Sequence, residues 1–210
     1  RQGVWPLMPV IEYFYAAHSA YAYLGSAKLM QIAREAGAVI EHRPMDLRKV
    51  VPASGSIPTG KRTTAHRAYF FGREIQRWSE ERGAPVVSGT PPHHWNDIEL
   101  PNCFLIAAME QGHNIDALAH RFLEAHWRDD ADLADAGTLV RLAGECSLDG
   151  EAILKDARSD SAKALYEQYT DEAINRSVFG SPTYFVDGDM FYGQDRLEMV
   201  AKALKQPYRR

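Results

Sequence analysis

The strand-like segments of this chain lie only near its two ends, and this constrains the fold more than any other feature. "VIEYFY" (10–15) alternates in the manner of a strand, and "AVIEHRP" (38–44) is a second such segment. Towards the C-terminus, "PTYFV" and "MFYG" flank the tight turn "DGD", a pattern typical of a hairpin. We therefore expect one sheet that is completed by both ends of the chain.

A helix is predicted between the first two strands. Apolar residues recur there at steps of four, three and three, at Tyr23, Ala27, Met30 and Ala33, and Gly37 ends the stripe. A strand, a helix and a strand with short links imply parallel strands and a right-handed crossover.

Helical patterns fill the middle of the chain. They follow a loop rich in Pro, Gly and Ser (50–60), and Gly, Asp or Ser punctuates them. "QDRLEMVAKALK" then closes the chain as an amphipathic helix. This order is the thioredoxin topology, so the fold class is α/β: a thioredoxin-like fold with a large all-helical insertion. We expect residues 8–50 and 176–206 to form the thioredoxin-like domain and residues 60–175 the inserted helical domain.

Composition excludes several classes of partner. A net charge of −4 gives no overall attraction for nucleic acid or an anionic membrane. No apolar stretch approaches a membrane-spanning length, and "RQGVWPLMPV" at the N-terminus lacks the apolar core of a signal peptide, so we expect a cytoplasmic protein. Cys103 and Cys146 lie far apart with no CxxC, so two free thiols are expected, with Cys103 buried.

Two short stretches sharpen the topology. "FGSPTYFV" places Pro182 directly before a strand, the usual position of a cis-proline in this fold. "HSAY" (18–21) opens the first helix, where redox members of the fold carry CxxC. Disulfide oxidoreduction is therefore the least expected activity.

The chain resembles the glutathione-dependent 2-hydroxychromene-2-carboxylate isomerases, which are relatives of kappa-class glutathione transferases and, more distantly, of DsbA-type oxidoreductases. The resemblance runs from about Val10 to Leu204. Its most specific stretch is "VFGSPTYFVDGDMFYGQDRLEM" (178–199), followed by "YAAHSAYAYLG" (15–25) and "REIQRW" (73–78).

The resemblance implies a glutathione site. Ser19 matches the family's active-site serine, placed near the glutathione sulfur. Ser181 and Pro182 offer backbone groups to the tripeptide, while Gln194 and Asp195 match positions that hold its γ-glutamyl end.

The chain also departs from the family. Lys61 stands where the family commonly has asparagine, and it is either a partner for a carboxylate of glutathione or substrate, or a plain surface lysine. Ala16, Ala20 and Ala22 replace an acidic residue, a proline and a serine. These changes bear on the substrate and the reaction more than on glutathione binding.

Physical chemistry supports a role for Ser19. A free thiol has a pKa of about 8.5, and lowering it by about two units requires roughly 2.7 kcal/mol in favour of the anion. A hydroxyl donated to a charged acceptor contributes roughly 1.5–3 kcal/mol, and a helix N-terminus adds roughly 0.3–1 kcal/mol. Ser19, just before the first helix, can supply both. The other interpretation is that Ser19 is simply an N-cap.

Other candidates have structural interpretations as well. Asp195 and Glu198 fit a D-x-x-E capping box, which is compatible with ligand contact. His18 is either an acid or base beside Ser19 or, as we favour, an exposed loop histidine. His93 and His94 look like a metal pair, but no partner stands at ligand spacing, so we expect a solvated loop and no metal.

The aromatic residues of the helical region divide into two groups. Tyr69 and Trp78 lie on a helix expected to wall the cleft, whereas Phe122 and Trp127 are expected in the core.

The resemblance implies an isomerase for an aromatic enone such as a hydroxychromene carboxylate. A thiolate would add to the conjugated enone, the resulting single bond would rotate, and loss of the thiolate would restore the double bond. Lys61 or Arg62 would hold the substrate carboxylate. The alternatives are a kappa-class-like glutathione transferase and a non-catalytic glutathione-binding protein. A homodimer is implied by the resemblance alone.

Overall fold

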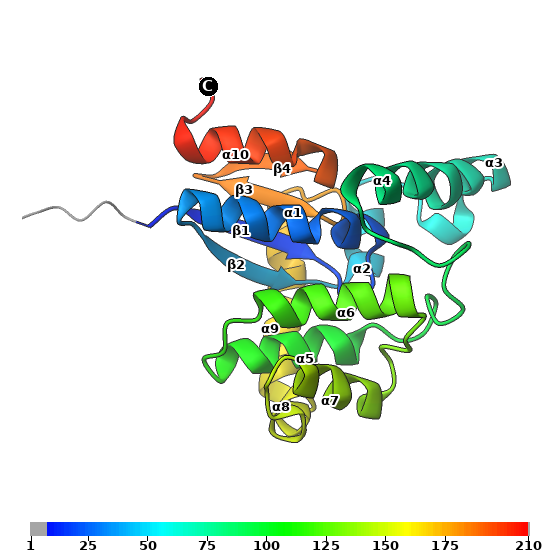
Figure 1. Cartoon of the computed structure of the whole chain (residues 1–210), viewed down its shortest axis with the longest axis vertical. Helices are drawn as coiled ribbons and strands as arrows, with labels where there is room; N and C mark the ends of the chain where they lie inside the picture. The colour runs from blue at the N-terminus through cyan, green and yellow to red at the C-terminus, as the bar shows by residue number, and fades with distance from the viewer. Residues whose placement is uncertain (1–7, 210) are drawn as a thin grey trace, which may run out of the picture.

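Both ends of the chain build one sheet, as the sequence predicts. The computed structural model describes residues 8–209, so the first seven residues of the N-terminal stretch and Arg210 lie outside the described part. The strands are ordered β2-β1-β3-β4, with β1 parallel to β2 and antiparallel to β3, and β3 antiparallel to β4 (Figure 1). Their bounds are β1 Val10–Tyr15, β2 Val39–Pro44, β3 Thr183–Val186 and β4 Asp189–Tyr192.

The first helix, α1 (Ala20–Ala36), makes the expected crossover between the parallel strands. Ser19 caps its first turn by accepting a hydrogen bond from the Ala22 amide. Gly37 ends it with φ of 61°, a left-handed conformation that glycine adopts without a steric penalty.

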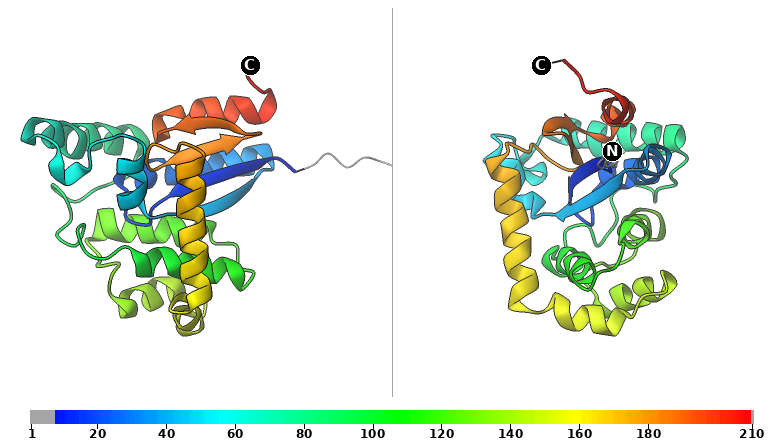
Figure 2. Two further views of the ribbon diagram at one scale, coloured as in Figure 1. Left: turned by 180° about the vertical axis from the view of Figure 1, so that it is seen from behind. Right: turned by 90° about the vertical axis from the view of Figure 1, so that its left-hand side faces the viewer.

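Helices cover both faces of the sheet. α1 and the last helix lie on one face, and α9 runs down past the other (Figures 1 and 2). α5 to α8 form a separate layer beyond the β2 edge, while α4 lies beside α1 (Figure 1). The helical bounds are α2 Leu47–Ala53, η1 Thr59–Lys61, α3 Thr64–Ala68, η2 Tyr69–Arg73, α4 Glu74–Arg82, α5 Glu99–Glu110, α6 Asp116–Asp129, α7 Ala136–Glu145, α8 Gly150–Ala157, α9 Asp160–Asn175, η3 Gln194–Arg196 and α10 Leu197–Lys205.

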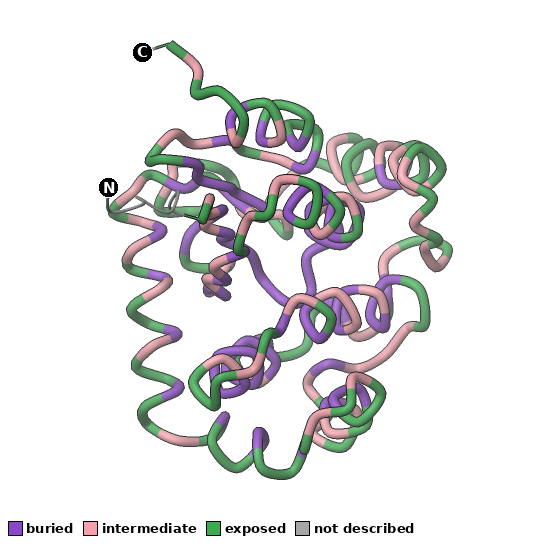
Figure 3. The backbone as a smooth tube through the Cα atoms, turned by 60° about the vertical axis from the view of Figure 1, so that its left-hand side comes forward, coloured by how far each residue is buried: buried purple, intermediate pink, exposed green. Residues whose placement is uncertain are grey.

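The buried side chains of β1 alternate between two cores. Tyr13 and Tyr15 pack in the larger core, which is continuous with the interior of the helical insertion. Phe14 points the other way, into a smaller core that includes residues of α9. Figure 3 shows the buried strands at the centre and α9 buried along one side only. Phe122 and Trp127 are fully buried, which confirms them as core residues.

Three further expectations are settled by the fold. Cys103 is buried, and both it and Cys146 are free thiols, as predicted. No helix within residues 8–209 is long and apolar enough to cross a membrane.

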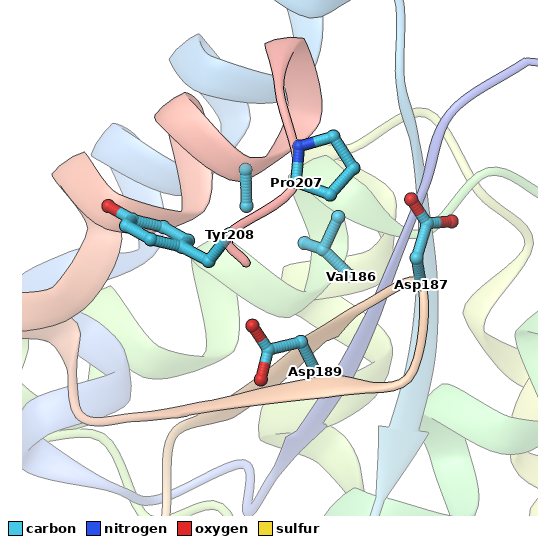
Figure 4. Close-up of a pocket in the computed structure, with 6 residues that line it drawn as sticks. Val186, Asp187, Asp189, Pro207 and Tyr208 are labelled. Carbon is cyan, nitrogen blue, oxygen red and sulfur yellow. The ribbon is translucent and has the colours of Figure 1, made fainter. Parts of the chain in front are cut away.

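The C-terminal segment folds back over the hairpin, where Tyr208 and Val186 line a cavity of about 20 Å³ (Figure 4). That volume suits one water molecule, so this cavity is not a ligand site.

Candidate active site

The turn Ala16–Ser19, which we call the serine turn, connects β1 to α1. It is closed by a 3.0 Å hydrogen bond from the Ser19 amide to the Ala16 carbonyl. The Ser19 hydroxyl accepts from the Ala22 amide at 3.2 Å and donates to the Ser181 carbonyl at 3.3 Å. Ser19 is therefore an N-cap, as its alternative interpretation proposed, and it also faces the loop before β3.

That loop contains the expected cis-proline, because the Ser181–Pro182 peptide bond is cis. The Ser181 hydroxyl accepts a hydrogen bond from the Ala16 amide at 3.2 Å, so the serine turn and the proline loop are joined in both directions. The structure thus brings together three of the residues predicted for the site, from opposite ends of the chain.

Gln194 and Asp195 lie next to the proline loop on η3. The Gly193 amide, one residue earlier, donates to the Pro182 carbonyl at 2.9 Å. Gly193 has φ of 99°, and a Cβ there would lie 2.4 Å from an Asp195 carboxylate oxygen, so this position requires glycine. The amides of Gln194 and Asp195 open a helical turn, where backbone donors lack intrahelical partners.

Arg82, at the end of α4, was not singled out by the sequence. Its guanidinium donates to the side-chain and backbone oxygens of Gln194 at 2.9 and 3.0 Å, and to Glu198 at 2.8 Å. The expected Asp195–Glu198 capping box is wrong, because neither η3 nor α10 has a side-chain cap in the described structure. The hydrogen bond from Arg82 instead engages Glu198 and lowers the pKa of its carboxyl group.

The two cations expected near the substrate carboxylate differ in their surroundings. Lys61 is exposed on η1, and no ion pair or hydrogen bond of its side chain is found within residues 8–209. Arg62 donates to the backbone carbonyl of Ile57 at 2.7 Å and so braces its own loop. Neither residue contacts Ser19, Pro182 or η3 through a hydrogen bond in the described structure.

His18 and His94 are buried, so the expectations of an exposed and a solvated loop histidine are wrong. The chain from 87 to 98 folds back over the serine turn, and the His94 ring lies 5.0 Å from that of His18. His94 Nδ1 is 3.1 Å from His126 Nε2, and His126 Nδ1 is 3.1 Å from the Ala131 carbonyl. We call His18, His94 and His126 the histidine stack.

Burial makes the histidine stack neutral. It lowers the pKa of His18 well below 6.5 and that of His94 to about 3, and it also lowers the pKa of His126. A neutral imidazole is the form that can accept a proton. His93 is half-exposed, 3.8 Å from Asp132, and within the described residues no group of His, Cys, Asp and Glu has the arrangement of a metal site.

A pocket of about 380 Å³ opens beside His94, and we call it the aromatic pocket. Phe71 and Trp95 line it, and their rings lie 5.9 and 5.1 Å from that of His94. Arg67 is its one charged lining residue among those described. Phe71 lies in η2, a π-helical turn, and such turns are frequent at functional sites.

Tyr69 and Trp78 do not line this pocket. Tyr69 is 46% exposed on η2, and Trp78 lies under the guanidinium of Arg82, 5.1 Å from the ring centre. The aromatic residue of the same helical segment that does line it is Phe71.

Comparison with known proteins identifies the family. The DSBA-like thioredoxin domain model matches residues 10–205. The chain belongs to the DSBA-like thioredoxin domain family. It is 28% identical over 199 residues to a 2-hydroxychromene-2-carboxylate isomerase of Sphingobium xenophagum, covering 92% of this chain and 97% of that one. It is 22% identical over 216 residues to glutathione S-transferase kappa 1 of Rattus norvegicus, covering 97% and 94%.

A solved structure of a 2-hydroxychromene-2-carboxylate isomerase superposes with a TM-score of 0.77 at 23% identity, covering 94% of this chain and 95% of that one. This similarity confirms the thioredoxin-like fold and its helical insertion. In this DSBA-like domain, the turn that opens α1 holds Ser19 and no cysteine, and both free thiols lie elsewhere. The serine turn therefore presents a hydroxyl and the first amides of α1, and neither thiol of the described residues lies in it.

Proposed function

We propose that this protein is a glutathione-dependent isomerase of an aromatic enone carboxylate, similar to a hydroxychromene carboxylate. The observation that carries the proposal is the position of the Ser19 hydroxyl, which lies at the N-terminus of α1 and 3.3 Å from the proline-loop carbonyl. The similarity to isomerases along nearly the whole chain supports the same reaction class.

The described residues fit glutathione at three places. The amides of Ala20 and Tyr21 begin α1 and are not engaged by any residue in 8–209, so with Ser19 they suit an anionic sulfur. On the cis-proline loop before Pro182, Ser181 is partly exposed, and its carbonyl becomes free for the tripeptide when the Ser19 hydroxyl turns to the anion. The first amides of η3, at Gln194 and Asp195, suit the γ-glutamyl carboxylate.

When bound, glutathione supplies the nucleophilic sulfur that allows a conjugated double bond to rotate. Ser19 stabilises negative charge at that position by turning its hydroxyl from the Ser181 carbonyl to the anion. This exchange is favourable, because a hydrogen bond to a neutral group contributes about 0.5–1.5 kcal/mol and one to a charged group about 1.5–3 kcal/mol. Burial of Ser19 excludes most competing water.

The aromatic pocket suits the substrate. Its volume falls within the range of about 300–1,000 Å³ that is usual for small-molecule sites. Phe71 and Trp95 provide apolar walls for a ring, and the Arg67 guanidinium suits a carboxylate. Lys61 and Arg62, on the preceding loop, remain proposed as additional carboxylate partners.

Two measurements test the proposal. Glutathione titrated into the protein should give a calorimetric binding signal and raise the melting temperature. A screen of aromatic enones with glutathione should then find one that changes geometry at constant mass. If saturating glutathione changes neither the heat signal nor the melting temperature, the proposal is wrong.

Glutathione transfer is the second candidate, since the rat kappa-class transferase is also similar along nearly its whole length. The same site would then leave the tripeptide attached to the product. Mass spectrometry separates the two reactions, because a conjugate gains the mass of glutathione. Binding without turnover of any enone or electrophile would leave a non-catalytic glutathione-binding protein.

A further inference from the structure

The serine turn is held by residues of the helical insertion as well as by its own hydrogen bonds. The Ala17 amide donates to the Asn102 side-chain oxygen at 3.0 Å, and the His18 carbonyl accepts from the Trp127 indole at 2.8 Å. Asn102 is on α5 and Trp127 on α6, and both side chains are fully buried.

These two contacts fix the peptide planes of the turn at both ends. In the plane between Ala16 and Ala17, the carbonyl accepts from Ser19 and the amide donates to Asn102. In the plane between His18 and Ser19, the carbonyl accepts from Trp127 and the amide donates to Ala16. The direction of the Ser19 Cα–Cβ bond is therefore set by partners on both sides of the turn.

Both holding residues are themselves fixed. The Asn102 amide group donates to the Ile98 carbonyl at 2.8 Å, which leaves its oxygen facing Ala17. The Trp127 ring packs edge-to-face against both His94 and His126, with ring centres 5.2 and 5.8 Å away. Buried polar groups that are satisfied in this way hold one geometry.

We infer that Asn102 and Trp127 are positioning residues for the proposed reaction, through which the helical insertion aims the Ser19 hydroxyl and the first amides of α1 at the glutathione sulfur. The inference rests on the proposed function. Hydrogen bonds weaken steeply with misalignment, so a turn free to rotate stabilises a thiolate less than one held at the peptide planes of both its ends.

The test compares Trp127→Phe and Asn102→Ala with the wild-type protein. Trp127→Phe keeps an aromatic ring and removes the donor to His18, while Asn102→Ala removes the acceptor for Ala17. The control is Phe122→Leu, which trims a fully buried ring on the same helix that makes no hydrogen bond to the turn. The pKa of the bound glutathione thiol is read from thiolate absorbance, and amide hydrogen exchange at the turn is measured without glutathione.

We expect each positioning variant to raise the thiol pKa by about one unit, roughly a tenfold loss of thiolate preference. Amide exchange at Ala17 should accelerate in Asn102→Ala, and Phe122→Leu should lower the melting temperature without moving either readout. An unchanged thiol pKa in both variants overturns the inference, as does an equal shift in Phe122→Leu. If wild-type protein binds no glutathione, the proposed function fails together with the inference; if it binds and only the variants are silent, the inference alone fails.

Discussion

The serine turn and the aromatic pocket both contact the histidine stack, but they are built in opposite ways. The serine turn is buried, and its peptide groups are hydrogen-bonded within the turn and to α5, α6 and the proline loop. The pocket is bordered by exposed side chains, with Trp95 57% exposed. The proposed site thus has a fixed half, at the serine turn and the proline loop, and an open half, at the aromatic pocket, whose lining can change without disturbing the fold.

The largest effect is expected from Ser19→Ala, which removes the hydroxyl from the fixed half. Loss of a hydrogen bond to a charged sulfur corresponds to about 1.5–3 kcal/mol, or roughly 10- to 150-fold in activity on an aromatic enone. Initial rates of enone isomerisation at saturating glutathione measure this loss of activity. Ser26→Ala, which replaces another buried serine of α1, is the control and should keep most activity. Equal turnover of Ser19→Ala and wild type would place the chemistry elsewhere.

Acid should destabilise the folded protein, because burial keeps the histidine stack neutral in the folded state. Unfolded histidines bind protons below about pH 6.5, whereas burial lowers the folded pKa of His94 to about 3. The contribution of neutral His94 to the free energy of unfolding is therefore fully present above pH 6.5. It is lost as pH drops towards 3, by on the order of 2–3 kcal/mol at pH 4. Urea unfolding at several pH values measures this slope.

His94→Phe tests the source of the slope, because it removes the most central titratable ring of the stack. Its unfolding free energy should depend less on pH between 6.5 and 4 than that of the wild type. His113→Gln, outside the stack, should keep the wild-type slope. An unchanged slope in His94→Phe would show that other groups govern acid sensitivity.

Gly25→Ala probes how tightly the fixed half is packed. A Cβ at Gly25 would lie 2.6 Å from Cβ of Gln194, so α1 and η3 would have to separate. We expect a loss of about 1–3 kcal/mol in stability and weaker glutathione binding. The matched control is Gly144→Ala on α7, where a Cβ meets nothing within 4 Å and the change should stabilise by up to about 1 kcal/mol. Thermal melts and calorimetry report both variants.

The smallest effect is expected from Arg67→Ala, which removes the charged side chain that lines the aromatic pocket. It tests whether the open half acts independently of the fixed half. Loss of one partly solvated cation is expected to raise KM for a carboxylate substrate about fivefold, corresponding to roughly 1 kcal/mol. The dissociation constant of glutathione should not change. If Arg67→Ala weakens glutathione binding as much as substrate binding, the two halves are not independent.

Much of the fold was predictable because it depends on local patterns. Turn chemistry and hydrophobic period identified β1, α1, the hairpin and the closing helix, and Ser19 occupies its expected position as N-cap. The proline before β3 also marked the place where the two ends of the chain meet.

The parts that could not be predicted depend on contacts between distant segments. His94 sits in a polar, proline-containing stretch, and nothing local shows that it folds over His18. Arg82 looks like an ordinary surface residue at a helix end until η3 is placed beside it. The capping box failed for the same reason, since Arg82 competes for Glu198. Asn102 did carry a sequence signal, because it is a polar residue inside an apolar helix.

The central position of β3 in the sheet has a consequence for the order of assembly. β3 lies between β1 and β4, and Ser19 meets its carbonyl partner 162 residues later in the chain. During synthesis, the N-terminal half of the site must wait for the whole insertion and for the hairpin to emerge from the ribosome. The proposed glutathione site is thus completed late, and a chain interrupted before the hairpin exposes an open sheet edge that attracts chaperones or other unfinished chains.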